Sequence, residues 1–155
     1  MGLGLPQGGS GRSFAPLLMA DTLPITYFES TAGLVLVHPA GRYAELRYRP
    51  GQRQPGDLSR LLTQLGRVLL QRGWHTFLAD NRQMAPFTDA EKQWFVTHWL
   101  GGEAPRPTPL TGVVVLPENV FARLSFQELY LQATTVQYRI FTDLPAAQAC
   151  LATLA

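Results

Sequence analysis

From residue 57 to the C-terminus, helical segments alternate with short strand-like segments, and this order constrains the fold more than any other feature. The first helix is predicted from an apolar stripe at helical spacing, formed by Leu58, Leu61, Leu62, Leu65, Val68 and Leu69. Gly56 or Asp57 begins it and Gly73 ends it, in line with capping preferences.

Three short segments in this region are predicted strands. They are HTFLAD (75–80), TGVVVL (111–116) and VQYRIF (136–141). TGVVVL is rich in β-branched residues and is bounded by Pro117, which is typical of a central parallel strand. Because strands that alternate with helices pair through right-handed crossovers, these segments predict a largely parallel sheet.

The remaining helices are predicted from their caps. Thr88 and Glu91 form a capping box that opens a helix running to Leu100. After Pro117 we expect two helical pieces, at 118–123 and from a second capping box at Ser125–Glu128 to about residue 133. Asp143 is expected to cap the last helix.

The N-terminal part of the ordered region predicts antiparallel strands. ITYFES (25–30) and GLVLVHP (33–39) alternate and suit a hairpin, and RYAELRYR (42–49) predicts a third strand. The sequence therefore predicts a single α/β domain over residues 21–155. Its mixed sheet would have about five to six strands, with the hairpin and mostly parallel strands, packed with about four helices.

Residues 1–20 differ from the rest, since they are rich in Gly, Pro and Ser without any period. We predict a disordered tail there and hypothesise that Met19 is the natural start. The longest apolar runs are too short to cross a bilayer, so we expect a cytoplasmic protein. The lone cysteine, Cys150, excludes an internal disulfide and is expected to be a packed thiol.

Motif spacing argues against the common catalytic and metal sites. The sequence has no GxSxG pattern, Walker loop or GxGxxG pattern, and His38, His75 and His98 lack the spacing of metal ligands. Asp89 and Glu91 are explained by the helix start. We therefore expect no catalytic residue, no metal and no cofactor.

The strongest charge feature is a basic cluster with one offsetting acid: Arg42, Arg47, Arg49, Arg53 and Glu45. Such a cluster could meet phosphates or an acidic partner. Alternation places Arg47 and Arg49 on one strand face with Tyr43. We interpret the cluster as a solvated sheet edge protected by its charges, which argues against nucleic-acid binding.

Four segments resemble the STAS-like family (sulfate transporter and anti-sigma factor antagonist domains), and in particular its small stand-alone SpoIIAA-like bacterial members. They are FLADNR (77–82), TDAEKQWF (88–95), GVVVLPENVFARLS (112–125) and YRIFTDLPAAQACL (138–151), and the resemblance spans about residues 25–154. It implies a regulatory protein-interaction module. Family members carry an Asp-Ser-Ser-Gly-like stretch with a phosphorylated serine, whereas this sequence has DNRQM at 80–84 and no hydroxyl before Thr88.

By this resemblance, an unknown protein partner would dock on the loop after the 75–80 strand and on nearby residues. The candidates are Asp80, Asn81, Arg82, Thr88, Glu118 and Asn119. Loops at that edge of a parallel sheet commonly bind ligands, and Arg82 could receive an anionic group. Asp80 and Asn81 could equally fold the loop while Arg82 pairs with Asp80. Thr88 suits an N-cap, and a phosphate there would also match the helix dipole.

The helix after Thr88 carries a broad aromatic face, namely Trp94, Phe95, His98 and Trp99. Core packing explains most of it, while one Trp could line a groove or form a homodimer contact. Relatives of the fold are grouped with the CRAL-TRIO lipid carriers, which gives an alternative function. In this alternative, Trp94 and Trp99 would cover an apolar groove that carries a small apolar ligand or lipid.

Overall fold

The computed structural model of this chain describes residues 23–133 and 135–154. The predictions for residues 1–20, the tail and the start at Met19, lie outside this part. The elements are β1 (Ile25–Glu29), β2 (Gly33–His38), β3 (Tyr43–Tyr48), α2 (Asp57–Arg72), β4 (Thr76–Asp80), α3 (Asp89–Trp94), η1 (Phe95–Leu100), β5 (Leu110–Val115), α4 (Val120–Tyr130), β6 (Val136–Phe141) and α5 (Leu144–Leu154). The predicted α/β fold class is confirmed.

The six strands form one mixed sheet in the order β1-β2-β3-β4-β5-β6. β1, β2 and β3 pair antiparallel, whereas β3 to β6 pair in parallel. The predicted central strand is confirmed, because Val113 of β5 pairs with Leu78 on one side and Arg139 on the other. The hairpin supplies the edge strand β1, but β3 lies inside the sheet and is not an edge.

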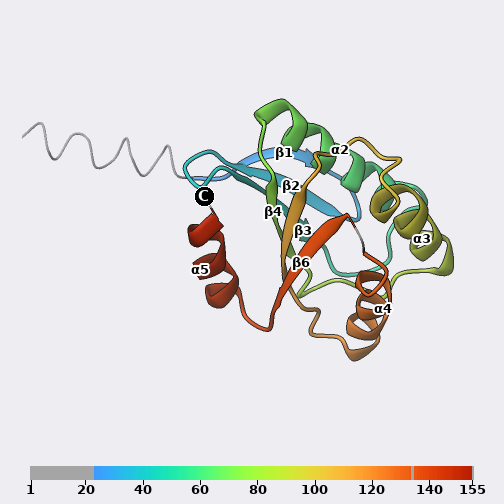
Figure 1. The fold of residues 1–155 in the computed structure, drawn as a ribbon. Helices are drawn as coiled ribbons and strands as arrows, with labels where there is room; N and C mark the ends of the chain where they lie inside the picture. The colour runs from blue at the N-terminus through green and yellow to red at the C-terminus, as the bar shows by residue number, and fades with distance from the viewer. Residues whose placement is uncertain (1–22, 134, 155) are drawn as a thin grey trace, which may run out of the picture.

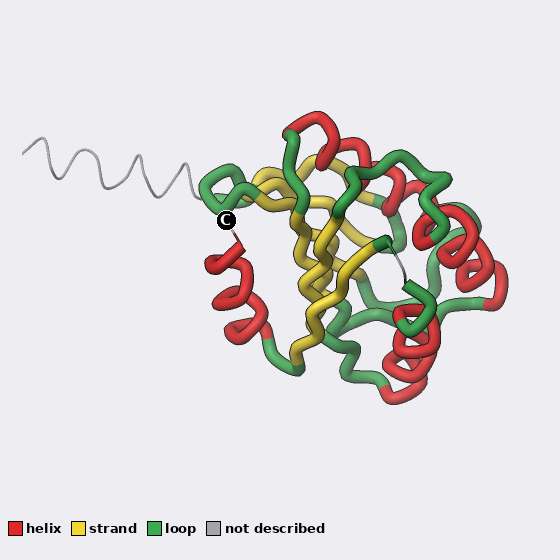
Figure 2. The backbone as a smooth tube through the Cα atoms, viewed as in Figure 1, coloured by secondary structure: helices red, strands yellow, loops and turns green. Residues whose placement is uncertain are grey.

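The helices cover the two faces of the sheet unequally. Figure 1 shows α5 alone on one side, with α2, α3 and α4 on the other, and Figure 2 shows the same separation in the tube view. Leu61, Leu65 and Trp99 belong to the larger core on the three-helix face. Leu151 of α5 packs with Val113 in a smaller core, against which Cys150 lies partly buried.

Glycines mark both ends of α2. Gly56 (φ 82°) and Gly73 (φ 67°) adopt the left-handed conformation that favours glycine. The Gly73 N–H donates to the carbonyl oxygens of Leu69 and Leu70, which satisfies groups that the helix end would leave unpaired. The stripe predicted for this helix is buried against the sheet.

The region after Pro117 corrects one prediction. It forms one helix, α4, instead of two pieces, and Asn119 is its N-cap, accepting from the Ala122 N–H at 3.0 Å. Ser125 is not a cap. It is buried inside α4, where its Oγ donates to the Ala122 carbonyl at 3.0 Å. The Asn119 cap makes a second helix start unnecessary, since the apolar face is continuous from Ala122 to Leu129.

The helix predicted from Thr88 to Leu100 consists of two helices of different type. α3 is α-helical, but Phe95–Leu100 form a π-helix, η1, which buries Phe95, Trp99 and Leu100 together. Periodicity at 3.6 residues per turn does not reveal this wider turn. Within the described ranges, no helix combines the length and apolar character that crossing a bilayer requires.

Candidate functional site

Asp80 and Arg82 form a bidentate ion pair at the end of β4. The Arg82 Nε lies 2.9 Å from Asp80 Oδ1, and its Nη2 lies 2.8 Å from Oδ2. Burial alone would raise the pKa of Asp80, but the hydrogen bonds from Arg82 outweigh it and hold the pKa below its ordinary value. Of the two roles that the sequence left open for Arg82, pairing with Asp80 is present, and the side chain remains partly exposed.

A second charged group lies beside this pair, and sequence reasoning missed it. The buried Glu45 carboxylate on β3 lies 2.8 Å from His38 Nε2 and accepts from Arg47 Nε at 2.7 Å. Burial raises the pKa of Glu45, but the hydrogen bonds from His38 and Arg47 outweigh it and lower the pKa overall. The alternation of Glu45 and Arg47 with apolar residues was the available signal, because it places both on one face of β3.

The arginine cluster does not lie on a sheet edge, because β3 pairs with a strand on each side, although Arg42 and Arg47 are exposed. Three of its members pair with glutamates: Arg47 with Glu45 at 2.7 Å, Arg49 with Glu29 at 2.8 Å and Arg53 with Glu91 at 2.8 Å. Arg47 also lies in register with Asp80 on the neighbouring strand β4. The pairing distributes these charges over separate parts of the molecule instead of one basic surface.

The carboxyl ends of the parallel strands enclose an open cavity of about 380 Å³, which we name the carboxyl-edge hollow. Its lining residues are Arg47, Tyr48, Asp80, Arg82, Gln83 and Glu118. The loops after β4 and β5 meet here, since the Glu118 N–H donates to the Arg82 carbonyl at 3.1 Å. Three of the predicted docking residues, Asp80, Arg82 and Glu118, are therefore brought together.

The other three predicted docking residues have structural roles away from the hollow. Asn81 is buried, and Asn119 caps α4. Thr88 caps α3 in the predicted capping box, which is confirmed: the Glu91 N–H donates to Thr88 Oγ1 at 3.1 Å, and the Thr88 N–H donates to Glu91 Oε1 at 2.9 Å.

An exposed apolar stripe on α4 begins next to the hollow, and sequence reasoning missed this feature as well. Its members are Val120, Phe121 and Leu124. Phe121 is 73% exposed, although an aromatic side chain of this size normally gains from burial. The opposite face of α4 packs on the sheet, so the helix carries apolar side chains on both faces. Such stripes mark interaction surfaces.

The two tryptophans of the predicted groove are separated. Trp99 is fully buried, meets Phe77 edge-on with ring centroids 6.1 Å apart, and donates from Nε1 to Tyr138 Oη at 3.2 Å. It does not line a groove, because it lies in the core one turn after the buried Phe95. Trp94 is partly buried and lines an open groove of about 430 Å³ with Pro55 and Leu58, among others. The cavity that Trp99 borders has only about 10 Å³.

Comparison with protein-family models, with curated proteins and with solved structures finds no match. Among residues 23–133 and 135–154, no group of three or more His, Cys, Asp or Glu side chains is placed to hold a metal ion.

Proposed function

We propose that this protein is a cytoplasmic, non-enzymatic interaction module with a regulatory role, as its resemblance to STAS-like domains implies. In this proposal a protein partner docks across the carboxyl-edge hollow and the exposed first turns of α4. The usual phosphorylated serine is replaced by the sequence DNRQM, so the binding would not depend on that switch.

The observation that carries the proposal is the continuity between a charged hollow and an apolar surface. Glu118 lines the hollow, and Val120 and Phe121 follow it within three residues on the exposed side of α4. Protein interfaces combine apolar anchors, often aromatic, with a polar surround. A surface that offers both at the carboxyl ends of parallel strands has the composition of a docking site.

Free guanidinium donors in the hollow, and not its net charge, favour an acidic group on the partner, because Asp80 and Glu118 balance Arg47 and Arg82 there. Among the described residues, Arg47 uses only Nε and Arg82 uses only Nε and Nη2 in side-chain hydrogen bonds. The remaining guanidinium nitrogens are donors that a carboxylate can accept from. We therefore propose a partner segment with an acidic residue beside apolar side chains.

The experiment is affinity capture from native lysate, followed by binding measurements with the purified partner. We expect Phe121→Ser and Arg82→Ala each to weaken binding at least tenfold, about 1.4 kcal/mol, because both remove contacts at the proposed centre. Leu131→Ser and Arg67→Ala are matched controls, since both residues are exposed and lie outside the hollow. Circular dichroism checks the fold of all four variants. Equal affinity for Phe121→Ser and Leu131→Ser would contradict the proposal.

The groove beside Trp94 supports a second candidate, the carriage of a small apolar molecule. Pro55, Leu58, Ala90 and Trp94 give it an apolar lining, and its volume of about 430 Å³ suits a small ligand. Native mass spectrometry of the purified protein would reveal a bound molecule. A ligand-induced change in fluorescence should then be lost in Trp94→Phe and kept in Trp74→Phe, and the reverse result would exclude this groove.

A further inference from the structure

Asn81 is a residue of the docking loop whose side chain points into the protein. It is 1% exposed, and its Oδ1 has no hydrogen-bond partner among the described residues. Its backbone is satisfied, because its N–H donates to the Val115 carbonyl at 3.1 Å and its carbonyl accepts from the Met84 N–H at 3.0 Å. Buried side-chain oxygens nearly always have a partner, so the Oδ1 of Asn81 requires an explanation.

The side chain of Asn81 lines a small cavity between the sheet and the three-helix layer. The cavity has about 10 Å³. The other lining residues are Leu46, Tyr48, Leu62, Phe77, Ala79, Phe95, Trp99, Val114, Phe126 and Tyr138. The space is close to the minimum that holds one water molecule, and it is far too small for an organic ligand.

Two tyrosines, Tyr48 and Tyr138, belong to the same lining. Tyr138 Oη accepts from Trp99 Nε1 at 3.2 Å, and within the described residues neither its proton nor that of Tyr48 is donated to a protein acceptor. Burial raises the pKa of both tyrosines, so both hydroxyls stay protonated and can donate as well as accept. The unpaired acceptor of Asn81 therefore shares this lining with two tyrosines, whereas most of the other lining residues are apolar.

We infer that this cavity is a binding site for a single water molecule, which donates to Asn81 Oδ1 and hydrogen-bonds to the hydroxyls of Tyr48 and Tyr138. A buried water makes about three hydrogen bonds, which is the number of groups available here. The water connects the loop after β4 to β3 and to β6. It fixes the inward position of Asn81, and thereby the positions of Asp80 and Arg82 on either side.

The first test uses the wild-type protein. A high-resolution crystal structure is expected to show one ordered water within about 2.7–3.2 Å of Asn81 Oδ1, the usual hydrogen-bond range. In solution, the same water should give a long-lived water-to-protein cross-peak in NMR spectra at the protons that line the cavity. A dry cavity, or an Asn81 amide that bonds directly to a tyrosine hydroxyl, would overturn the inference.

Two variants make the assignment specific. Asn81→Leu keeps a similar volume without polar groups, and Tyr138→Phe removes one hydroxyl while keeping the ring. Each is expected to abolish or strongly weaken the water cross-peak, and Asn81→Leu should also accelerate amide exchange at Met84. Arg67→Ala, on the exposed face of α2, is the control and should retain the signal. An unchanged cross-peak in a folded Asn81→Leu variant would refute the water site. If that variant does not fold, the crystal structure and the NMR spectra of the wild-type protein decide whether the water is present.

Discussion

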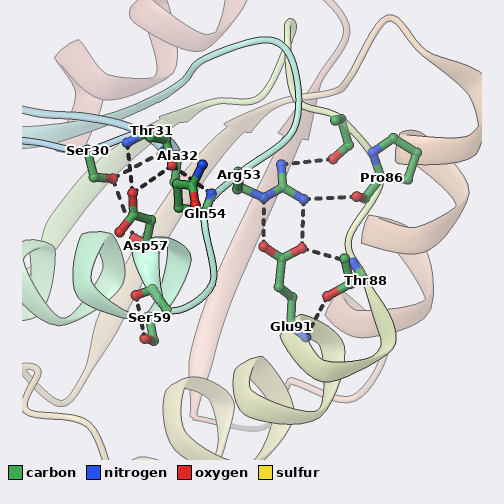
Figure 3. A network of polar contacts seen from close by, with 12 residues as sticks. Ser30, Thr31, Ala32, Arg53, Gln54, Asp57, Ser59, Pro86, Thr88 and Glu91 are labelled. Carbon is green, nitrogen blue, oxygen red and sulfur yellow. Dashed lines mark hydrogen bonds and ion pairs between the residues drawn. The ribbon is translucent and has the colours of Figure 1, made fainter.

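Arg53 and Glu91 face each other in a bidentate ion pair that joins the segment before α2 to the first turn of α3. Arg53 Nε and Nη2 each lie 2.8 Å from a Glu91 carboxylate oxygen, and the guanidinium also donates to the carbonyls of Ala85 and Pro86 (Figure 3). The Arg53 side chain is only 3% exposed. All three guanidinium nitrogens of Arg53 donate hydrogen bonds within the protein, so this arginine holds two loops together.

Replacing one partner of this buried pair should lower the stability of the fold. We expect Arg53→Met to lower the free energy of unfolding by about 3–5 kcal/mol, because it leaves the Glu91 charge without its main partner. Urea denaturation measures this change. Arg49→Met is the control, since the Arg49–Glu29 pair is 40% and 59% exposed and should be worth under about 1 kcal/mol. If Arg53→Met lost as little stability as the control, Arg53 would not have the structural role described here.

The same pair predicts how stability depends on pH. Burial raises the pKa of Glu91, but hydrogen bonds from Arg53 and Thr88 outweigh it and lower the pKa below its ordinary value. A carboxyl whose pKa is lower in the folded than in the unfolded state stabilises the fold above the unfolded pKa, about 4.3, and this contribution is lost as the pH falls through the folded pKa. Unfolding measured from pH 7 to pH 3 should therefore show a smaller acid loss in Glu91→Gln than in the wild type. An identical slope in both proteins would show that Glu91 does not contribute.

Thr88 is expected to act through its capping hydroxyl. Thr88→Ala should destabilise the protein by about 1 kcal/mol, whereas Thr88→Ser keeps the acceptor for the Glu91 N–H and should cost much less. Chemical denaturation of the two variants compares them directly. If both lose the same stability, the methyl group of Thr88 matters and the cap does not.

The two tryptophans of the aromatic face should differ in their importance for stability. Trp99→Ala removes a fully buried indole and its hydrogen bond to Tyr138, and is expected to cost about 3–5 kcal/mol. Trp94→Ala removes a partly exposed side chain and should cost clearly less. Thermal or urea unfolding distinguishes the two, and equal losses would mean that Trp94 is also a core residue.

Gly66 should reverse the usual preference of helices for alanine. It lies inside α2, where a Cβ would collide with the Pro105 carbonyl of the loop before β5. Alanine normally favours a helix interior by about 1 kcal/mol over glycine, but here we expect Gly66→Ala to destabilise the protein by about 1–3 kcal/mol. Arg67→Ala at the next, exposed position is the control and should change stability little. If Gly66→Ala instead stabilised the protein, the loop that carries Pro105 would be free to move away from α2.

Much of the fold could be predicted because its signals are local. The stripe of α2, the capping box at Thr88 and the Asp143 cap, which accepts from the Ala146 N–H at 2.8 Å, all depend on neighbours within a few residues. The β-branched composition of 111–116 likewise identified the central strand. These features were determined by the sequence alone, since backbone hydrogen bonds and side-chain periodicity fix them without reference to distant segments.

The candidate site depended on contacts between distant segments. Glu45 is buried between His38 and Arg47, and Asn81 turns inward although its neighbours Asp80 and Arg82 line the hollow. Periodicity identifies an apolar helix, but whether a given face is covered depends on which strand or helix packs there. The stripe on α4 that exposes Phe121 and the separation of Trp94 from Trp99 were therefore decided only by the tertiary structure, because burial is a property of the assembled layers and not of any one segment.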